Sequence, residues 1–116
     1  MLAALLSDFS DADLLSPQRM SKRLRLPIAD FARLAHLHRN TLARPKSAAV
    51  QKKLEPIARL LAQVEEIAGD PDQAIVWFRY QPLPGFAGQT AQQLVEAGHA
   101  DAVFTYLEEL RDGGYA

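Results

Sequence analysis

Apolar residues recur at helical spacing through the middle of the chain, at Val50, Leu54, Ile57, Leu61, Val64 and Ala68. Steps of four and three residues place these side chains on one face of an α-helix. Pro56 interrupts the pattern, so the helix is either kinked at this residue or begins there. Gly69 then ends it as a left-handed C-cap. No stretch alternates between apolar and polar residues as a strand does, and we predict an all-α fold.

Helix start and stop signals divide the rest of the chain. Ser-Pro at 16–17 and Asp-Pro at 70–71 each combine an N-cap residue with a proline suited to the first helical position. Thr90 with Gln93 forms a capping-box pattern, and Gly98 and Gly113 are suited to helix ends. These signals predict helices from Pro17, from Pro27 to about Ala35, over 38–44, from Pro71, over 91–97 and over 100–112. The segment "PLPGFAG" is too rich in proline and glycine for regular structure.

The opening "MLAALLS" is apolar, but it is too short for a membrane span or a signal peptide. We interpret residues 1–15 as an N-terminal arm that is either an amphipathic helix or partly disordered. No other stretch is apolar enough to cross a membrane, and the chain has no cysteine. These features predict a cytoplasmic protein without a membrane partner.

Charge divides the chain into two unlike halves. Residues 1–60 carry eleven Lys or Arg against five Asp or Glu, a net charge of +6, whereas residues 61–116 carry two against nine, a net charge of −7. Such asymmetry suggests two partners of opposite character, one of them a nucleic acid. A basic face can also be merely solvated, so charge alone does not decide.

The stretch "IADFARLAHLHRNTLAR" has the pattern of a helix-turn-helix and resembles that of Xre-like bacterial regulators. His36 falls where the turn requires a left-handed backbone, and "HRNTLAR" is predicted as the second, DNA-facing helix. Arg and Asn side chains can bind base edges, while Thr and Lys can reach phosphates. The predicted DNA-binding residues are His38, Arg39, Asn40, Thr41, Arg44 and Lys46. However, Pro45 limits this helix to about two turns, and many small helical domains share the arrangement without binding DNA.

The C-terminal half resembles the toxin-binding domain of the Xre/MbcA/ParS-like antitoxins. The similarity lies in "AIVWF", the loop "PLPGFAG", then "QTAQQLVEAGHADAV", "YLEEL" and the closing "GGYA". Many relatives carry Gly-Gly where this chain has Ala87-Gly88, and Thr/Ser-Pro where it has Thr90-Ala91. These departures concern the loop conformation. With the resemblance, the chain divides into the arm 1–15, a helix-turn-helix unit 16–46 for DNA binding or dimerisation, and a toxin-binding domain 47–116.

The resemblance implies a partner, a RES-domain toxin that consumes NAD, which the antitoxin neutralises by blocking the active-site cleft. The antitoxin itself would bind no cofactor or small-molecule substrate. It would act as a homodimer within a larger toxin–antitoxin complex and would bind its own promoter DNA. In this family the C-terminal end reaches toward the toxin's active site, which makes Tyr115 an aromatic anchor and the Ala116 carboxylate a substitute for phosphate. The implied toxin-binding residues are Arg79, Tyr80, Phe86, Glu109, Asp112, Gly113, Gly114, Tyr115 and Ala116.

Other side chains have simpler interpretations. The apolar residues Trp77, Phe78, Leu94, Val103, Leu107 and Leu110 are expected in the core. Phe86 is the aromatic residue that we first expect to be exposed, with Tyr80 as the second candidate. The acidic residues Glu65, Glu66, Glu96, Glu108, Glu109 and Asp112 would complement a basic cleft, or would simply be solvated. Arg79 would pair with a local carboxylate or with the partner.

Enzymatic functions lack their parts in this sequence. There is no Gly-rich phosphate loop or nucleophile elbow, and we predict no catalytic and no metal-binding residues. His36 and His38 stand only two residues apart, with no cysteine or carboxylate cluster nearby. Two alternatives to the antitoxin interpretation stay open. One is a stand-alone helix-turn-helix transcriptional regulator, and the other is a protein-binding adaptor that does not bind DNA.

Overall fold

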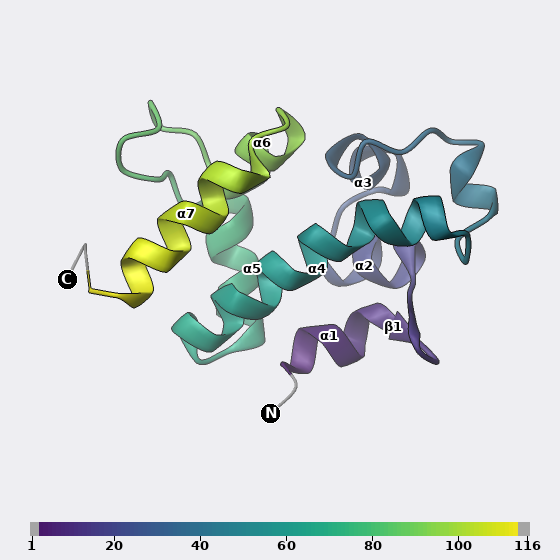
Figure 1. The fold of residues 1–116 in the computed structure, drawn as a ribbon, viewed down its shortest axis with the longest axis horizontal. Coiled ribbons are helices and arrows are strands. Elements are labelled where there is room, and N and C mark those ends of the chain that lie inside the picture. The colour runs from purple at the N-terminus through teal and green to yellow at the C-terminus, as the bar shows by residue number, and fades with distance from the viewer. Residues whose placement is uncertain (1–2, 114–116) are drawn as a thin grey trace.

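The structure is a computed structural model that describes residues 3–113, and it is built almost entirely of helices (Figure 1). The α-helices are α1 (Ala4–Phe9), α2 (Pro17–Arg23), α3 (Ile28–Leu34), α4 (Ala48–Ala68), α5 (Pro71–Tyr80), α6 (Ala91–Glu96) and α7 (Ala100–Arg111). A 3₁₀ turn, η1 (Thr41–Ala43), and a two-residue strand pair, β1 (Ser10–Asp11) with β2 (Leu14–Leu15), complete the described residues. The predicted all-α class is confirmed.

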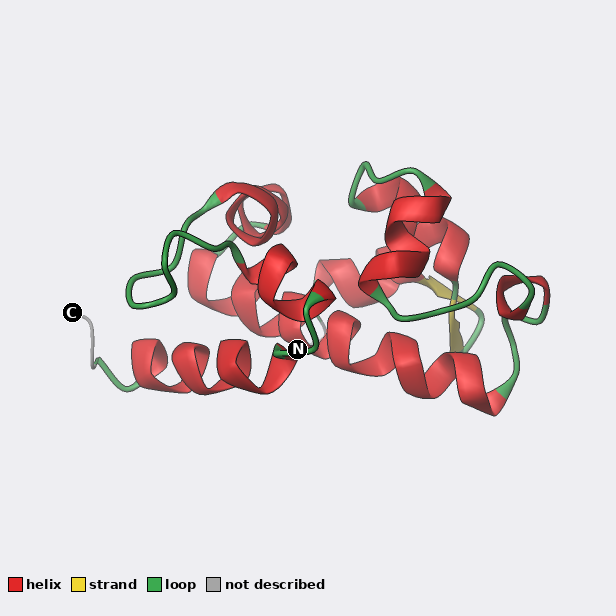
Figure 2. Ribbon diagram, turned by 90° about the horizontal axis from the view of Figure 1, so that it is seen from above, coloured by secondary structure: helices red, strands yellow, loops and turns green. Residues whose placement is uncertain are grey.

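Helix α4 is the element on which the others assemble. It crosses the molecule from end to end, and α1, α2, α5 and α7 lie around it (Figures 1 and 2). Its buried face consists of Val50, Leu54, Ile57, Ala58, Leu60, Leu61 and Val64, which includes the apolar positions predicted from the sequence as far as Val64. Pro56 lies inside the helix, so the helix does not begin there. One core cluster extends along the chain from Leu5 to Leu107, and the division at residues 15 and 46 stays a prediction.

Local capping chemistry explains where most helices begin and end. The side chain of Ser16 accepts a hydrogen bond from the backbone N–H of Arg19 at 3.2 Å, and Asp70 accepts one from Gln73 at 2.8 Å. Thr90 and Gln93 cap each other reciprocally, as predicted. Gly69, Gly98 and Gly113 follow helices with positive φ values of 77°, 90° and 83°. These predicted boundaries are confirmed, because each depends on residues only a few positions apart.

The predicted DNA-facing helix over residues 38–44 is wrong. His36 has the left-handed backbone expected of the turn (φ 59°), but the chain then forms only the three-residue 3₁₀ turn η1. The hydroxyl of Thr41 donates to the carbonyl of His38 at 2.7 Å, a local bond that competes with helical geometry. Within residues 38–44 only Thr41 and Leu42 are half-buried, and none is buried. So short a stretch, without an apolar face to pack, cannot offset the cost of helix nucleation.

The N-terminal segment is part of the core. Helix α1 buries Leu5 and Phe9 completely, so the amphipathic-helix alternative for this segment is confirmed. The hairpin β1–β2 follows, with Ala12 at φ 59° in its turn. The sequence prediction missed this strand pair because two residues per strand are too few to show an alternating pattern.

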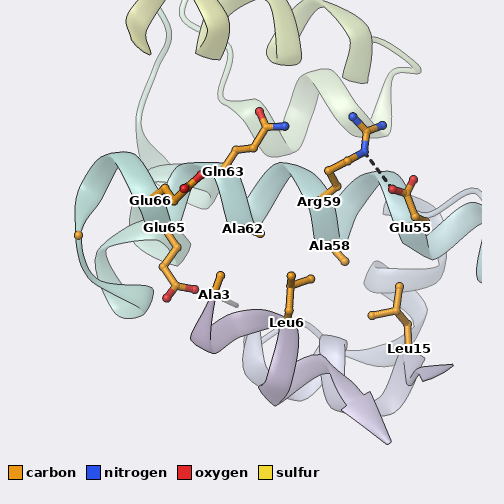
Figure 3. A pocket seen from close by; sticks show the side chains of 11 residues that line it. Ala3, Leu6, Leu15, Glu55, Ala58, Arg59, Ala62, Gln63, Glu65 and Glu66 are labelled. Atoms are coloured by element: carbon orange, nitrogen blue, oxygen red, sulfur yellow. Dashed lines mark hydrogen bonds and ion pairs between the residues drawn. The ribbon is translucent and has the colours of Figure 1, made fainter. Parts of the chain in front are cut away.

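Side chains from distant positions secure α1 and the hairpin. The Glu65 carboxylate, on α4, accepts hydrogen bonds from the N–H groups of Ala4 at 2.9 Å and Leu5 at 2.8 Å, and so caps the N-terminus of α1 (Figure 3). The Gln51 side chain accepts from the N–H of Leu15 at 3.0 Å and donates to its carbonyl at 2.8 Å. A six-residue helix is not stable alone, so these bonds help to define where α1 lies.

Arg23 joins α1 and α5 through α2. It lies 3.0 Å from both Asp8 and Asp72. Burial alone would lower the pKa of Arg23, but hydrogen bonds and charge attraction from the two carboxylates outweigh it and raise that pKa. The arginine is therefore charged at any physiological pH and holds the two acidic residues together.

Replacing Glu65 should destabilise the fold. Glu65→Ala leaves two N–H groups of α1 without their charged acceptor, and we expect a loss of about 1–3 kcal/mol in the free energy of unfolding, measured by urea denaturation. Glu66→Ala is the matched control, because Glu66 is the exposed neighbour and caps no helix; its effect should stay within about 0.5 kcal/mol. Equal effects of the two substitutions would contradict the capping role.

Candidate functional site

The region after α4 forms a compact unit of α5, a closed loop, α6 and α7. The loop over residues 81–90 is closed by a bridge between Pro82 and Thr90 and by a hydrogen bond from the N–H of Leu83 to the carbonyl of Gln89 at 2.9 Å. Ala87, at the position where the resembling family often has glycine, has a φ of 55°. An alanine in this conformation costs about 1 kcal/mol relative to glycine. The substitution is therefore accommodated without altering the left-handed turn.

An aromatic cluster attaches this loop to α7. The ring of Tyr106 stacks on Trp77, with centroids 6.3 Å apart, and receives Phe86 edge-on, also at 6.3 Å. Phe86 is half-buried as a result, and the prediction that it is exposed is wrong. The second candidate, Tyr80, is exposed over 62% of its surface. The loop folds back so that Phe86 packs against the core. The amino-acid sequence of the loop does not show this packing.

The other core expectations mostly hold. Phe78, Leu94, Val103 and Leu107 are buried as predicted. Trp77 and Leu110 are only half-buried, packed against the edge of the core cluster.

Arg79 serves the fold. Its Nη1 donates to the carbonyl oxygens of Leu24 at 3.2 Å and Arg25 at 3.3 Å, and its Nε to the Gln92 side chain at 3.4 Å. Its guanidinium lies 5.0 Å from the ring centroid of Tyr80. The local carboxylate partner considered in the sequence analysis is therefore absent within residues 3–113. Arg79 instead connects α5 with α6 and with the turn that leads from α2 to α3.

The predicted toxin-binding residues fall into separate places. Arg79 and Tyr80 end α5, whereas Glu109, Asp112 and Gly113 lie at the C-terminal end of α7, which is close to the end of α4 where α5 begins (Figure 1). The two places are therefore separated by roughly the length of α5, which is about 15 Å for its ten residues. Gly114, Tyr115 and Ala116 lie outside the described residues.

A shallow hollow of about 420 Å³ lies where α7 ends. It is lined by Glu66, Ile67, Leu110 and Arg111. Ile67 is 40% exposed, and the sequence analysis did not select it. The signal that could have identified Ile67 in the sequence is that this isoleucine lies outside the periodic apolar face of α4. The hollow is adjoined in sequence or structure by Glu109, Asp112 and Gly113. Together they form the candidate protein-binding surface, which we call the α7 end.

The acidic residues have different roles in the fold. Glu65 is engaged as the cap of α1, so it is not available to a partner as the sequence analysis considered. Glu96 lies 4.0 Å from Arg33. Glu66, Glu108, Glu109 and Asp112 are exposed. The negative surface near the α7 end therefore rests on these four side chains.

The predicted DNA-binding residues gather at the opposite end of α4. His38, Arg39, Asn40, Arg44 and Lys46 are exposed and Thr41 is half-buried, all in the segment that contains η1. Lys52 and Lys53, exposed on the first turns of α4, lie beside this segment and were not selected from the sequence. We call the surface formed by Arg39, Arg44, Lys46, Lys52 and Lys53 the basic end.

Two further features of the described residues bear on function. Within residues 3–113, no group of three or more His, Cys, Asp or Glu is arranged to hold a metal ion. None of the helices in the same range combines the length and apolar character that crossing a bilayer requires.

One family model matches the C-terminal part of the chain. Residues 63–113 match the model of the antitoxin Xre/MbcA/ParS C-terminal toxin-binding domain. The match supports the antitoxin family. It spans α5, the closed loop, α6 and α7 together with the last turns of α4, and it supports a toxin-neutralising role with a toxin as the partner. Neither the curated proteins nor the solved structures gave a match to this chain.

Replacing Arg79 tests its structural role. Arg79→Met keeps the aliphatic part of the side chain but removes the donors to Leu24, Arg25 and Gln92. We expect a loss of about 1–2 kcal/mol in the free energy of unfolding, measured by urea denaturation. Arg111→Met, at an exposed position in the same C-terminal unit, is the control and should change stability by less than about 0.5 kcal/mol. Unchanged stability of the Arg79 variant would show that its carbonyl contacts contribute nothing.

Proposed function

We propose that this protein is the antitoxin of a RES-domain toxin and neutralises that NAD-consuming enzyme by blocking its active-site cleft. The observation that carries the proposal is the match of residues 63–113 to an antitoxin toxin-binding domain. In this proposal the chain has no enzymatic activity of its own and binds no cofactor. It acts as a cytoplasmic homodimer within a larger complex with the toxin.

The α7 end supports this mode of inhibition. Gly113, with a φ of 83°, turns the chain immediately after α7, next to the hollow lined by Ile67 and Leu110. The exposed carboxylates Glu108, Glu109 and Asp112 give this part of the molecule a negative charge. A cleft built for a dinucleotide carries positive charge for its phosphates, so the two surfaces are complementary. Residues Gly114, Tyr115 and Ala116 would enter the cleft, with Tyr115 as the anchor.

Arg79, Tyr80 and Phe86 have different prospects as toxin contacts. Tyr80 presents a large exposed aromatic surface of the kind found in protein interfaces. The Arg79 guanidinium lies against that ring, and Phe86 is half-buried against Tyr106. We propose Tyr80 as a direct contact at a second patch, and Arg79 and Phe86 as residues that position the surface.

Promoter DNA is the proposed second partner, bound at the basic end. Binding of the toxin and the promoter by one molecule would use the α7 end and the basic end at the same time. Their separation by the length of α4, about 30 Å for 21 residues, leaves room for both partners.

Co-expression tests the antitoxin function. Cells that produce a RES-domain toxin encoded beside this gene should survive when the full chain is also made. Deletion of Gly114–Ala116 should restore toxicity, because the residues that enter the cleft are lost. The far-UV circular dichroism of the truncated chain should stay unchanged, since α7 ends at Arg111. A Lys46→Gln variant, altered at the other end of the molecule, should neutralise as the natural chain does.

Two outcomes would contradict this proposal in different ways. Continued killing by the cognate toxin in the presence of the full chain would remove the antitoxin function. Full neutralisation by the truncated chain would keep that function but would exclude the C-terminal residues from the inhibitory contact.

Promoter binding makes a separate prediction. The double variant Arg39→Ala/Arg44→Ala should bind a duplex of the operon's own promoter about tenfold or more weakly, because two phosphate-neutralising charges are lost. Fluorescence anisotropy at two salt concentrations measures the change. Binding that is the same for both proteins would exclude these arginines from the DNA contact.

A further inference from the structure

The basic end belongs to a stretch of the chain that has no carboxylates. No Asp or Glu occurs between Asp30 and Glu55, whereas Arg33 and the five residues of the basic end all fall there. In the structure this stretch forms the tip of the molecule, where the segment with η1 meets the first turns of α4 (Figures 1 and 2). Five of the thirteen Lys and Arg residues therefore lie at this tip, within a stretch of sequence that has no carboxylate.

Specific contacts hold the two parts of this tip together. The amide of Gln51, on α4, donates to the carbonyl of Pro45 at 2.9 Å. The Ser47 side chain accepts from the N–H of Val50 at 3.3 Å and caps α4. Lys52 and Lys53 line a small hollow of about 180 Å³ together with His36. Since the N-terminus of α4 faces the same tip, its dipole adds to the positive potential.

The charges of the basic end have no internal compensation. Within residues 3–113, none of its five side chains takes part in an ion pair. The basic residues of α2 differ, because Arg19 lies 3.9 Å from Asp11 and Arg23 lies 3.0 Å from Asp8 and from Asp72. A bound polyanion would relieve the mutual repulsion among these five side chains. No ion pair within residues 3–113 does so.

The local backbone determines how such a polyanion can be recognised. Reading base edges in the major groove usually requires a helix that presents several side chains to the groove. The segment offers the three-residue turn η1 instead of the predicted helix. Lysine ammonium groups act as point charges that suit phosphates without selecting a base.

We infer that the basic end binds the phosphate backbone of duplex DNA without reading its sequence, and that Lys52 and Lys53 of α4 are part of this contact. The inference rests on the DNA binding proposed above and changes its mode.

Salt dependence and competitor sequence test this mode. Fluorescence anisotropy of the full chain is measured with a promoter duplex and with a scrambled duplex of equal length and composition. Affinities for the two should agree within about threefold. Five neutralised phosphates give a slope of about −4 to −5 for log K against log salt, which is a loss of about 500-fold between 50 and 200 mM.

A charge-matched pair of variants tests the residues. Lys52→Gln/Lys53→Gln should weaken binding about tenfold or more and reduce the slope by about two. Arg19→Gln/Lys22→Gln removes the same charge from exposed positions on α2 and should change affinity by less than about threefold. Circular dichroism checks that both variants keep the helical fold.

Each contrary result has a distinct meaning. A promoter preference of more than about tenfold would overturn the inference but keep the proposed promoter binding. Failure to bind either duplex would overturn both. Equal losses in the two variants would overturn the assignment of Lys52 and Lys53, because net charge alone would explain them. None of these results bears on toxin neutralisation, which co-expression measures independently.

Discussion

The burial of one face of α4 is the constraint on which the rest of this structure depends. Short helices such as α1 and α6, with six residues each, are not stable in water by themselves, and they gain stability by covering the apolar residues of the long helix or its neighbours. The faces of α4 that remain uncovered carry Lys52 and Lys53 near its start and Glu66 near its end. One helix thus supports the core and also separates two surfaces of opposite charge.

Much of this fold was predictable where its cause is local. The caps at Ser16, Asp70 and Thr90 and the glycine at 69 act within four residues, so their chemistry is legible in the sequence. The helix predicted over 38–44 does not form, because a helix this short needs an apolar face that packs on another element. The local sequence does not show whether such a partner surface exists. The bonds of Glu65 to Ala4 and Leu5 span about 60 positions and lay beyond such reasoning.

The candidate site was predictable to a smaller degree. The motifs around "AIVWF" and "PLPGFAG" indicated the same toxin-binding domain whose model matches residues 63–113, because a local motif can be read without knowing the fold. Individual surface roles depended on contacts made elsewhere in the fold. Arg79 is engaged by the carbonyl groups of Leu24 and Arg25, and Phe86 by the ring of Tyr106. Ile67 and Lys53 became candidates only when the positions of neighbouring elements were known.

The exposed basic residues near the start of α4 and the exposed carboxylates near its end place opposite charges at separate ends of a molecule whose longest extent is 43 Å. A charged partner therefore exerts a torque on the protein before contact, and turns the matching end toward itself during diffusion. A nucleic acid and a protein with a basic cleft would meet the same molecule from opposite directions. Neither approach would have to wait for the other surface to become free.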